Sequence, residues 1–171
     1  YIILYVTNRC NFRCDFCFYY AEIDKGRKPT ELTLDEIDKI TKSAGRLVQL
    51  SMTGGEPFIR KDFIELTRIT LNNTRAKYVT IPTNGYLTEN IYDYLNKILP
   101  EFPKSYFRLT LSIDGIEEEH DINRSKPGSY KRIIETHNKI KDLRNKYSNL
   151  VLDSNTVFTA NTEGRMIKIL K

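Results

Sequence analysis

The 171 residues include no tryptophan, only two histidines and only three cysteines. Histidine and cysteine are therefore too few for several kinds of disulfide-linked or metal-binding protein. An odd number of cysteines cannot close entirely into disulfides, and nothing in the sequence indicates secretion. A structural zinc site needs four ligands, yet His120 and His137 lie more than a hundred residues beyond the last cysteine. No apolar run approaches the ~18 residues of a membrane span. These absences exclude a disulfide scaffold, disfavour structural zinc and predict no spanning helix.

The charge is modest and spread along the chain. The net charge is +5, and 29% of the residues are charged, which is ordinary for a globular protein. The basic residues are scattered over expected helices, where a solvated helix face explains them. Without a basic stripe interleaved with aromatic residues, a nucleic-acid partner is not expected. Free thiols without other cysteines suit a reducing compartment, so we expect a cytoplasmic protein.

All three cysteines lie within residues 10–17, directly after the apolar run at 2–6, as Cys10, Cys14 and Cys17. Three thiolates this close suit three corners of a 4Fe-4S cubane, because each corner iron takes one cysteine. One iron is then left without a protein ligand. A ferredoxin needs a fourth cysteine, and a thioredoxin-like pair of Cys14 and Cys17 leaves Cys10 without a role. The stretch predicts an iron-sulfur cluster with one open iron.

The cysteine spacing, with Phe16 and Phe18 on either side of Cys17, resembles that of the radical S-adenosylmethionine (radical SAM) enzymes. Thr-Gly-Gly-Glu-Pro at 53–57, Thr-Asn-Gly at 83–85 and Ser-Ile-Asp-Gly at 112–115 match family motifs in the same order. The resemblance implies an enzyme that binds a 4Fe-4S cluster and SAM. It also implies reductive cleavage of SAM to methionine and a 5'-deoxyadenosyl radical, which abstracts hydrogen from a substrate.

Within the family the motifs look most like those of the SPASM-type peptide and protein maturases and of the molybdenum-cofactor cyclase. A peptide or protein is therefore the expected substrate, and a small molecule or lipid is the alternative. The alternative from another class is a non-catalytic iron-sulfur binding module. The resemblance also implies a reductase partner such as flavodoxin or ferredoxin. No protein nucleophile or acid-base triad is expected, since the cofactor supplies the difficult chemistry.

The length suits one domain, and we interpret residues 1–171 as a radical SAM core domain. A complete eight-unit barrel needs ~250 residues, which is more than this chain has. The sequence begins within an expected strand and stops within an expected helix, so we expect a fragment of a longer chain.

Strand and helix patterns alternate five times, which predicts parallel strands joined by crossover helices. The expected strands are 2–7, 47–53, 78–83, 106–113 and 150–159. The expected helices are 34–45, one opening at Asp62 and Glu65, 89–98 between Thr88 and Pro100, 129–147 and 162–171, with 120–128 as a loop. Thr33 with Glu36, and Asp62 with Glu65, have capping-box spacing. We predict an α/β partial (β/α)6-type TIM-like barrel with five βα units and the sixth strand missing.

Alternation within the strands predicts what the barrel encloses. In strand 106–113 the odd positions from Phe107 to Ile113 are apolar, and the opposite face carries Arg108, Thr110 and Ser112. Strand 47–53 alternates likewise, with Val48, Leu50 and Met52 on its apolar face. A polar inner face indicates an open barrel that holds a ligand, since a filled barrel is apolar inside.

Arg108 is the charge that this alternation places inside the barrel. It lies four residues before Ser112, or ~13 Å deeper at ~3.3 Å per residue, too far to contact SAM. A charge in a lumen is costly unless it is paired. We expect an ion pair with Asp153 on the barrel floor, direct or through water, or else an Arg108 that reaches solvent at the open bottom.

Each motif falls just after the carboxyl end of an expected strand, where barrels of this type build their sites. Cys10 follows the first strand, Gly54 the second, Asn84 the third, Asp114 the fourth and Asn161 the fifth. The resemblance therefore places the cluster and SAM at one edge of the sheet.

The resemblance implies that residues 53–57 hold the SAM amino group, through Gly54, Gly55 and Glu56. Glycine lets a backbone approach a ligand closely, and a carboxylate accepts hydrogen bonds from a cationic amine. The alternative is an ordinary tight turn before Pro57. A valine at Gly55 would fill the space for SAM, so we expect it to abolish SAM binding and to leave the cluster.

Further SAM contacts follow from the same resemblance. Phe16 is expected against the adenine, Thr83 and Asn84 near SAM or substrate, and Ser112 at the ribose. The alternatives are a core phenylalanine, an ordinary turn at 83–85, where Asn and Gly tolerate positive φ, and a small lumen residue at 112.

Asn155 and Arg124 complete the expected set. Asn155 has a lumen position equivalent to that of Ser112. Arg124 ends a segment at 120–124 that resembles one in the subfamily with C-terminal auxiliary clusters. A solvent-exposed loop arginine is the alternative for Arg124, because loops are polar by default but also carry function.

Overall fold

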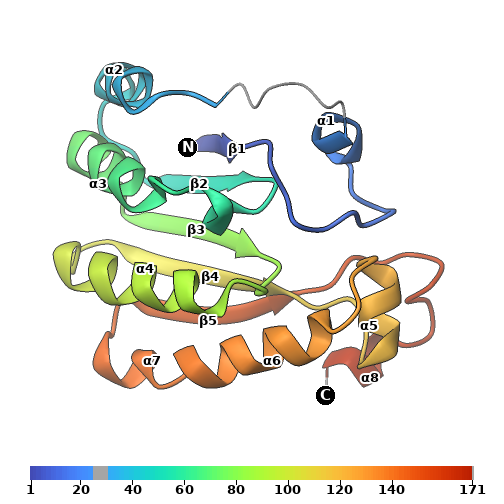
Figure 1. Cartoon of the computed structure of the whole chain (residues 1–171). Coiled ribbons are helices and arrows are strands. Elements are labelled where there is room, and N and C mark those ends of the chain that lie inside the picture. Colours follow the sequence, from blue (N-terminus) through green and yellow to red (C-terminus); the bar gives the residue numbers. More distant parts are fainter. Residues whose placement is uncertain (25–30, 171) are drawn as a thin grey trace.

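The fold is built on one sheet of five parallel strands in chain order (Figure 1). The computed structural model describes residues 1–24 and 31–170. The strands are β1 (Ile2–Thr7), β2 (Gln49–Gly54), β3 (Tyr78–Thr83), β4 (Tyr106–Ser112) and β5 (Leu150–Asn155). Each strand pairs with the next, while β1 and β5 do not pair. The predicted α/β architecture is confirmed, and the sheet is open.

Most of the helices cover one face of this sheet (Figure 1). The helices are α1 (Tyr20–Asp24), α2 (Leu34–Ala44), α3 (Phe63–Thr74), α4 (Thr88–Glu101), α5 (Glu118–Asn123), α6 (Ser129–Ile140), α7 (Leu143–Lys146) and α8 (Met166–Leu170), with a 3-10 turn at Pro57–Ile59. Of these, α1, α5 and α8 lie at the end toward which the strands point. Helices α2, α3, α4 and α6 lie in that order along the sheet, each against the next (Figure 1). No helix in residues 1–24 and 31–170 combines the length and hydropathy of a membrane span.

The sequence signals for helix caps and helix ends predicted one helix start correctly and were wrong at other positions. The capping box of α2 is confirmed, because Glu36 N donates to Thr33 Oγ1 at 3.3 Å and Thr33 N to Glu36 Oε2 at 2.8 Å. The predicted capping box at Asp62 is wrong, since its carboxylate pairs with Arg60 at 2.8 Å. Thr88 is the first residue of α4 and not its cap, and its hydroxyl forms a hydrogen bond with the Thr136 hydroxyl at 2.6 Å. Pro100 lies inside the last turn of α4 and does not end it.

Six further features differ from the prediction. Strand β2 starts at Gln49 and not at 47, and α1 was not predicted. Helix α5 takes up the first part of the expected loop at 120–128, and the expected helix at 129–147 is divided into α6 and α7. Helix α8 begins at Met166 and not at 162. Strand β5 ends at Asn155 because Thr156 Oγ1 donates to Ile113 O and Val157 N to Asp114 Oδ1, which turns the chain out of the ladder.

The two faces of the sheet differ as the alternation predicts. Leu50, Met52 and Leu109 are at most 1% exposed beneath the helices. Val48 was predicted on this apolar face but is 68% exposed, because it precedes β2 at the uncovered end of the sheet. The inner face is also less polar than predicted. In addition to the polar residues it carries exposed apolar side chains, namely Ile3, Tyr5, Tyr78, Tyr106 and Val151.

The predicted pair on the barrel floor is present but exposed. Arg108 Nη1 lies 3.4 Å from Asp153 Oδ2, and the two side chains are 59% and 36% exposed. Solvent screens such a pair, so we expect a coupling energy below about 1 kcal/mol. A double-mutant cycle of Arg108→Met and Asp153→Asn on the free energy of unfolding measures it. A coupling of several kcal/mol would contradict an exposed pair.

Candidate functional site

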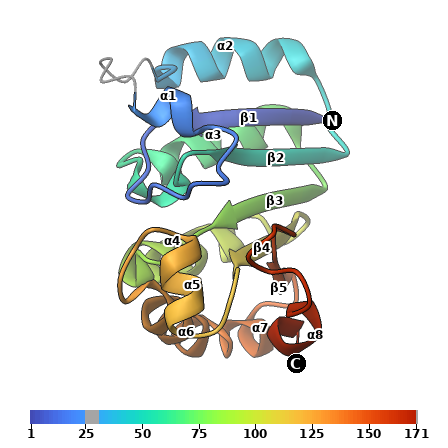
Figure 2. The ribbon, with the colours of Figure 1, turned by 90° about the vertical axis from the view of Figure 1, so that its right-hand side faces the viewer.

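The three cysteines lie on the loop that leaves the carboxyl end of β1. Figure 2 looks onto this edge of the sheet, with the segment after β1 and helix α5 in front of the strands. Cys14 is buried, and Cys10 and Cys17 are partly exposed. The pKa of the Cys10 thiol is raised to about 11, mainly by burial and in addition by the negative charges of Glu56 and of the other two thiolates. The structure therefore brings the three sulfur atoms into one electrostatic environment.

The donor set fits a cluster better than a single ion. Among the described residues, no three His, Cys, Asp or Glu side chains converge on one metal position. A cubane takes each cysteine on a different iron, so its ligands need not converge. His120 is unsuited to zinc, because its Nδ1 already accepts from Asp114 N at 3.2 Å. Burial also raises the pKa of Cys14. Metal binding must then release protons from these thiols.

Gly54 and Gly55 allow the end of β2 to pack closely on the cysteine loop. Gly55 N donates to Thr7 O, and Glu56 N donates to Arg9 O, both at 2.9 Å. A Cβ on Gly55 would collide with the carbonyl oxygen of Arg9 and lie 3.1 Å from the Cys10 Cβ. A Cβ on Gly54 would collide with Thr7 O. In this structure the glycines are therefore required by the cysteine loop itself.

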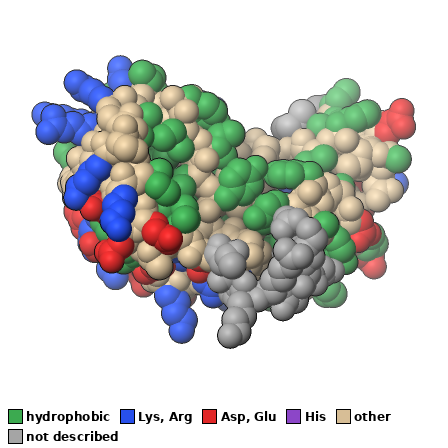
Figure 3. Space-filling view, turned by 90° about the horizontal axis from the view of Figure 1, so that it is seen from above, with side chains coloured by type: hydrophobic (Ala, Val, Ile, Leu, Met, Phe, Trp, Pro, Cys, Tyr) green, Lys and Arg blue, Asp and Glu red, His purple; other side chains and the backbone are tan. Residues whose placement is uncertain are grey.

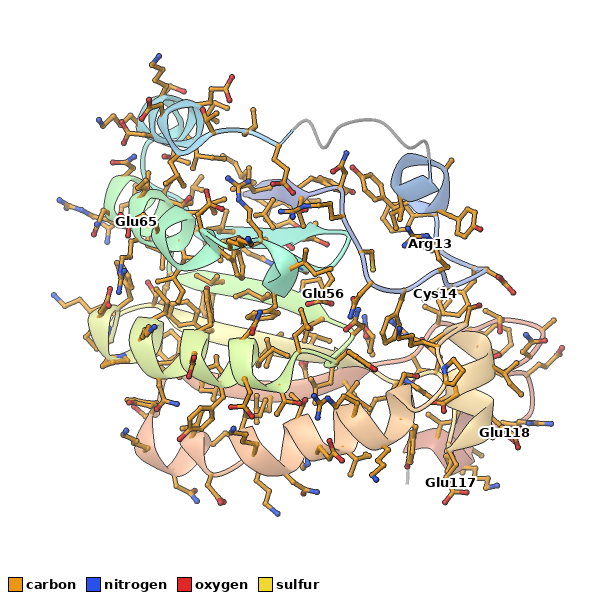
Figure 4. All side chains as sticks on the ribbon, viewed as in Figure 1. Arg13, Cys14, Glu56, Glu65, Glu117 and Glu118 are labelled. Carbon is orange, nitrogen blue, oxygen red and sulfur yellow. The ribbon has the colours of Figure 1, made fainter. Side chains whose placement is uncertain are left out.

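Glu56 is 1% exposed and joins the end of β2 to the end of β3. Its Oε1 accepts from Thr83 Oγ1 at 2.7 Å, and its Oε2 accepts from the Asn84 backbone N at 2.8 Å. Figure 4 shows Glu56 at the same end of the sheet as Cys14. Both carboxylate oxygens already have partners in the chain, so the structure gives Glu56 a positioning role. Its contact with SAM stays a prediction.

A second link runs from β3 to the cysteine loop. Asn84 Nδ2 donates to Asn11 Oδ1 at 2.8 Å. Asn11 was not predicted as a site residue, although it lies between the first two cysteines. Thr83 and Ser112 are 3% and 8% exposed at the same edge. The structure thus brings Thr83, Asn84 and Ser112 together near the loop.

Asp114 organises the ends of β4 and β5. This carboxylate is fully buried, and its Oδ2 accepts from Arg124 Nε at 2.6 Å and from Nη2 at 2.5 Å. Its Oδ1 accepts from Val157 N at 2.7 Å. Asn123 Nδ2 donates to the Asp114 backbone oxygen at 2.5 Å. The sequence motif at 112–115 contains Asp114, but only the fold reveals its partners.

Arg124 connects this network to the cysteines. It is 9% exposed, so the alternative of a solvent-exposed arginine is wrong. Its backbone oxygen accepts a hydrogen bond from Cys14 Sγ at 3.6 Å, and its guanidinium lies 5.8 Å from the centre of the Phe16 ring. Asn155 is exposed at the end of β5, and its backbone oxygen accepts from Ile113 N at 2.9 Å. Their SAM contacts stay predictions.

Stability should fall with pH where Glu56 titrates. Burial raises its pKa from 4.5 to about 7 despite the hydrogen bonds it accepts. The native state then holds a proton that the unfolded state has lost, so stability present below pH ~4.5 declines up to pH ~7, by at most ~1.4 kcal/mol per unit. The contribution of His120 to stability instead rises from about pH 4 to pH 6.5, because burial lowers its pKa from 6.5 to about 4.

The comparison of wild type with Glu56→Gln isolates this effect. Both proteins are unfolded thermally at intervals from pH 5 to 8. The Gln variant loses one acceptor and is less stable throughout, but the difference from wild type should shrink as pH rises through the Glu56 titration. A constant difference would show that Glu56 is ionised throughout this range.

Comparison with known proteins identifies the family. The family model described as "Radical SAM superfamily" matches residues 4–171. A GTP 3',8-cyclase of Pasteurella multocida (strain Pm70) is 38% identical over 88 residues, which cover 50% of this chain and 26% of the relative. A GTP 3',8-cyclase of Haemophilus influenzae (strain PittGG) is 29% identical over 135 residues, which cover 72% of this chain and 39% of the relative.

Solved structures share the fold. The structure "Native anSMEcpe with bound AdoMet" superposes with a TM-score of 0.71 at 21% identity, over 98% of this chain and 46% of that one. The structure with AdoMet and the Cp18Cys peptide gives 0.68 at 22% identity, over 98% and 45%. These likenesses confirm the partial TIM-like barrel. The chain spans less than half the length of these proteins.

Radical SAM enzymes bind a 4Fe-4S cluster and SAM, and this chain supplies the matching residues at one edge of its sheet. Its three cysteines follow β1, and the glycine segment of β2 packs directly on their loop. The chain belongs to the radical SAM superfamily.

Proposed function

We propose that this chain is the core domain of a radical SAM enzyme, in which Cys10, Cys14 and Cys17 each bind one iron of a 4Fe-4S cluster. The observation that carries the proposal is the packing of residues 54–56 on the cysteine loop, through Thr7 O and Arg9 O. When bound, the cluster passes one electron to SAM, which yields methionine and the 5'-deoxyadenosyl radical that takes hydrogen from the substrate. The protein itself positions the reactants and excludes water.

The SAM site in this proposal lies where the strand ends meet the cysteine loop. Its contacts are Phe16, Gly54, Gly55, Glu56, Thr83, Asn84, Ser112, Arg124 and Asn155. Backbone groups of the glycine segment and buried polar groups at the β3 and β4 ends supply hydrogen bonds in a site shielded from water. Asp114 acts by holding Arg124 in place. A reductase such as flavodoxin or ferredoxin supplies the electron, as suits a cytoplasmic enzyme.

A peptide or protein is the substrate class we propose first, because the motifs resemble those of peptide maturases among others, and a structure that shares the fold is described with a bound peptide. GTP is the second candidate, since a relative named GTP 3',8-cyclase is 38% identical over 88 residues, half of this chain. The two candidates differ in a direct assay. Substrate-dependent transfer of deuterium into 5'-deoxyadenosine, from deuterated GTP or from a deuterated peptide, distinguishes them.

The enzyme proposal is tested with reconstituted protein under anaerobic conditions. We expect about four irons per chain and the formation of 5'-deoxyadenosine after dithionite and SAM are added. Cys14→Ala should lose the cluster absorbance and form no 5'-deoxyadenosine. A wild-type protein with a full cluster and bound SAM that never forms 5'-deoxyadenosine would instead be a non-catalytic iron-sulfur module. Full cluster absorbance in Cys14→Ala would refute the ligand set.

A further inference from the structure

A groove of about 1070 Å³ crosses the amino-terminal edge of the sheet, opposite the cysteines. It lies between the turn before β2, the turn from α3 to β3 and the turn from α4 to β4. Its volume exceeds the ~300 to 1,000 Å³ of pockets for small ligands. The strands are six or seven residues long, which separates the groove from the cluster loop by ~20 Å. Its occupant is therefore not the group that reacts with the radical.

Four exposed cations line this groove, namely Arg46, Arg75, Lys77 and Lys104. Within residues 1–24 and 31–170, none of the four forms an ion pair. Lys77 Nζ lies 5.4 Å from the centre of the Tyr78 ring. Figure 3 shows Lys and Arg side chains gathered at the left end of the molecule, where the strands start in Figure 1. The groove thus presents positive charge that the described chain leaves unneutralised.

The single acid of the groove does not offset this charge. Glu101 is held by Arg68 from outside the groove, with its two oxygens 2.8 Å and 2.5 Å from Arg68 Nε and Nη2. This bidentate ion pair holds the Glu101 carboxylate on Arg68. An incoming anion therefore meets the four cations without a free carboxylate among them.

Apolar side chains are exposed in the groove, and its walls are fixed by hydrogen bonds. Val48 is 68% exposed there, and Phe102 is partly exposed beside it. Asn149 Nδ2 holds the turn from α4 to β4 through three carbonyl oxygens, at 3.1, 3.1 and 3.2 Å. Ser105 Oγ donates to Ala76 O at 2.7 Å and ties this turn to the next. A preformed surface loses little entropy when it binds.

Arg75 has a backbone conformation that normally favours glycine. It caps α3 with φ 48° and ψ 40°, and its N donates to Leu71 O at 2.8 Å. Glycine is the usual residue at this position, because a Cβ strains the left-handed conformation. A strained residue that carries an exposed, unpaired guanidinium into a groove points to a role for that side chain.

We propose that this groove binds an acidic peptide segment of a partner protein, anchored by an apolar side chain on Val48 and Phe102. An apolar centre with a charged rim is the usual anatomy of a protein interface. The complementary partner carries Asp or Glu on both sides of an aliphatic residue. Nucleic acid fits less well, because its interfaces are more polar than a groove in which Val48 is exposed and Phe102 partly exposed.

The test uses a fluorescein-labelled peptide with acidic residues on both sides of a central leucine, measured by fluorescence anisotropy. The double variant Arg75→Glu, Lys104→Glu should bind at least about tenfold more weakly. Lys131→Glu, Arg144→Glu makes the same charge change on α6 and α7, at residues that do not line the groove, and should change affinity by less than about twofold. Val48→Ser should weaken binding even at high salt, where screening removes much of the ionic contribution.

Arg75→Gly separates binding from folding. It removes the charge and the backbone strain together, so it should raise the midpoint of thermal unfolding while it weakens binding of the peptide. The proposal is overturned if a peptide with lysine in place of each acid binds equally well, or if the α6 and α7 control weakens binding as much. It is also overturned if an oligothymidylate displaces the acidic peptide and loses affinity in the same groove variants, because the occupant is then nucleic acid.

Discussion

Gly55→Ala is expected to remove nearly all of the iron from the reconstituted protein, because the added methyl group has no space. Its Cβ would overlap the Arg9 carbonyl oxygen, lie 2.6 Å from the Arg9 carbonyl carbon and approach the Cys10 Cβ to 3.1 Å. These are mainly backbone atoms, so the cysteine loop itself must move. The hydrogen bond from Glu56 N to Arg9 O is then lost. Iron content and SAM binding should fall together.

This result differs from the sequence-based expectation for Gly55→Val, in which SAM binding is lost and the cluster is retained. The structure places the cysteine loop in the space next to Gly55, so a larger side chain should affect the cluster first. Gly128→Ala is the matched control. It has φ 76° and no atom within 4 Å of its added Cβ, so it should cost about 1 kcal/mol of backbone strain and no iron. Full iron content in Gly55→Ala would show that the loop adapts.

Asp114→Asn is expected to destabilise the protein by about 3 to 5 kcal/mol, because it leaves a buried guanidinium without its counter-charge. The Asp114 and Arg124 side chains are 1% and 11% exposed. Asparagine keeps the volume of the side chain but not its charge. Since Arg124 O accepts from Cys14 Sγ, we also expect lower iron content. Urea unfolding measures the first effect, and iron analysis measures the second.

Two variants check this interpretation. Asp114→Asn combined with Arg124→Met should be more stable than Asp114→Asn alone, because no unpaired charge stays buried. Asp93→Asn on α4 removes an exposed carboxylate and should change stability by less than ~0.5 kcal/mol. If the double variant were as unstable as the sum of the single variants, the two side chains would not act as a pair.

Local spacing and periodicity predicted the order of the strands, and the motifs in the sequence predicted the family. Three cysteines within eight residues specify their own proximity without any tertiary contact. Alternation in β4 identified Leu109 as buried and Arg108 as facing the lumen, because the pleat has a period of two. The capping box at Thr33 was also readable, since its partner lies three residues away. Each of these signals operates within one element or one loop.

The tertiary structure decided which partners the site residues have. Glu56 meets Thr83 across 27 residues, and Cys14 meets Arg124 across 110. From sequence alone, Arg124 suited either a SAM contact or a solvent-exposed loop residue. Sequence spacing does not define distances between loops that meet only at the edge of a sheet. Asp62 misled for a related reason. Its carboxylate pairs with Arg60, two residues away, and Arg60 is itself held by the distant carbonyl oxygens of Val6 and Leu32, so local capping propensity is a weak force beside such contacts.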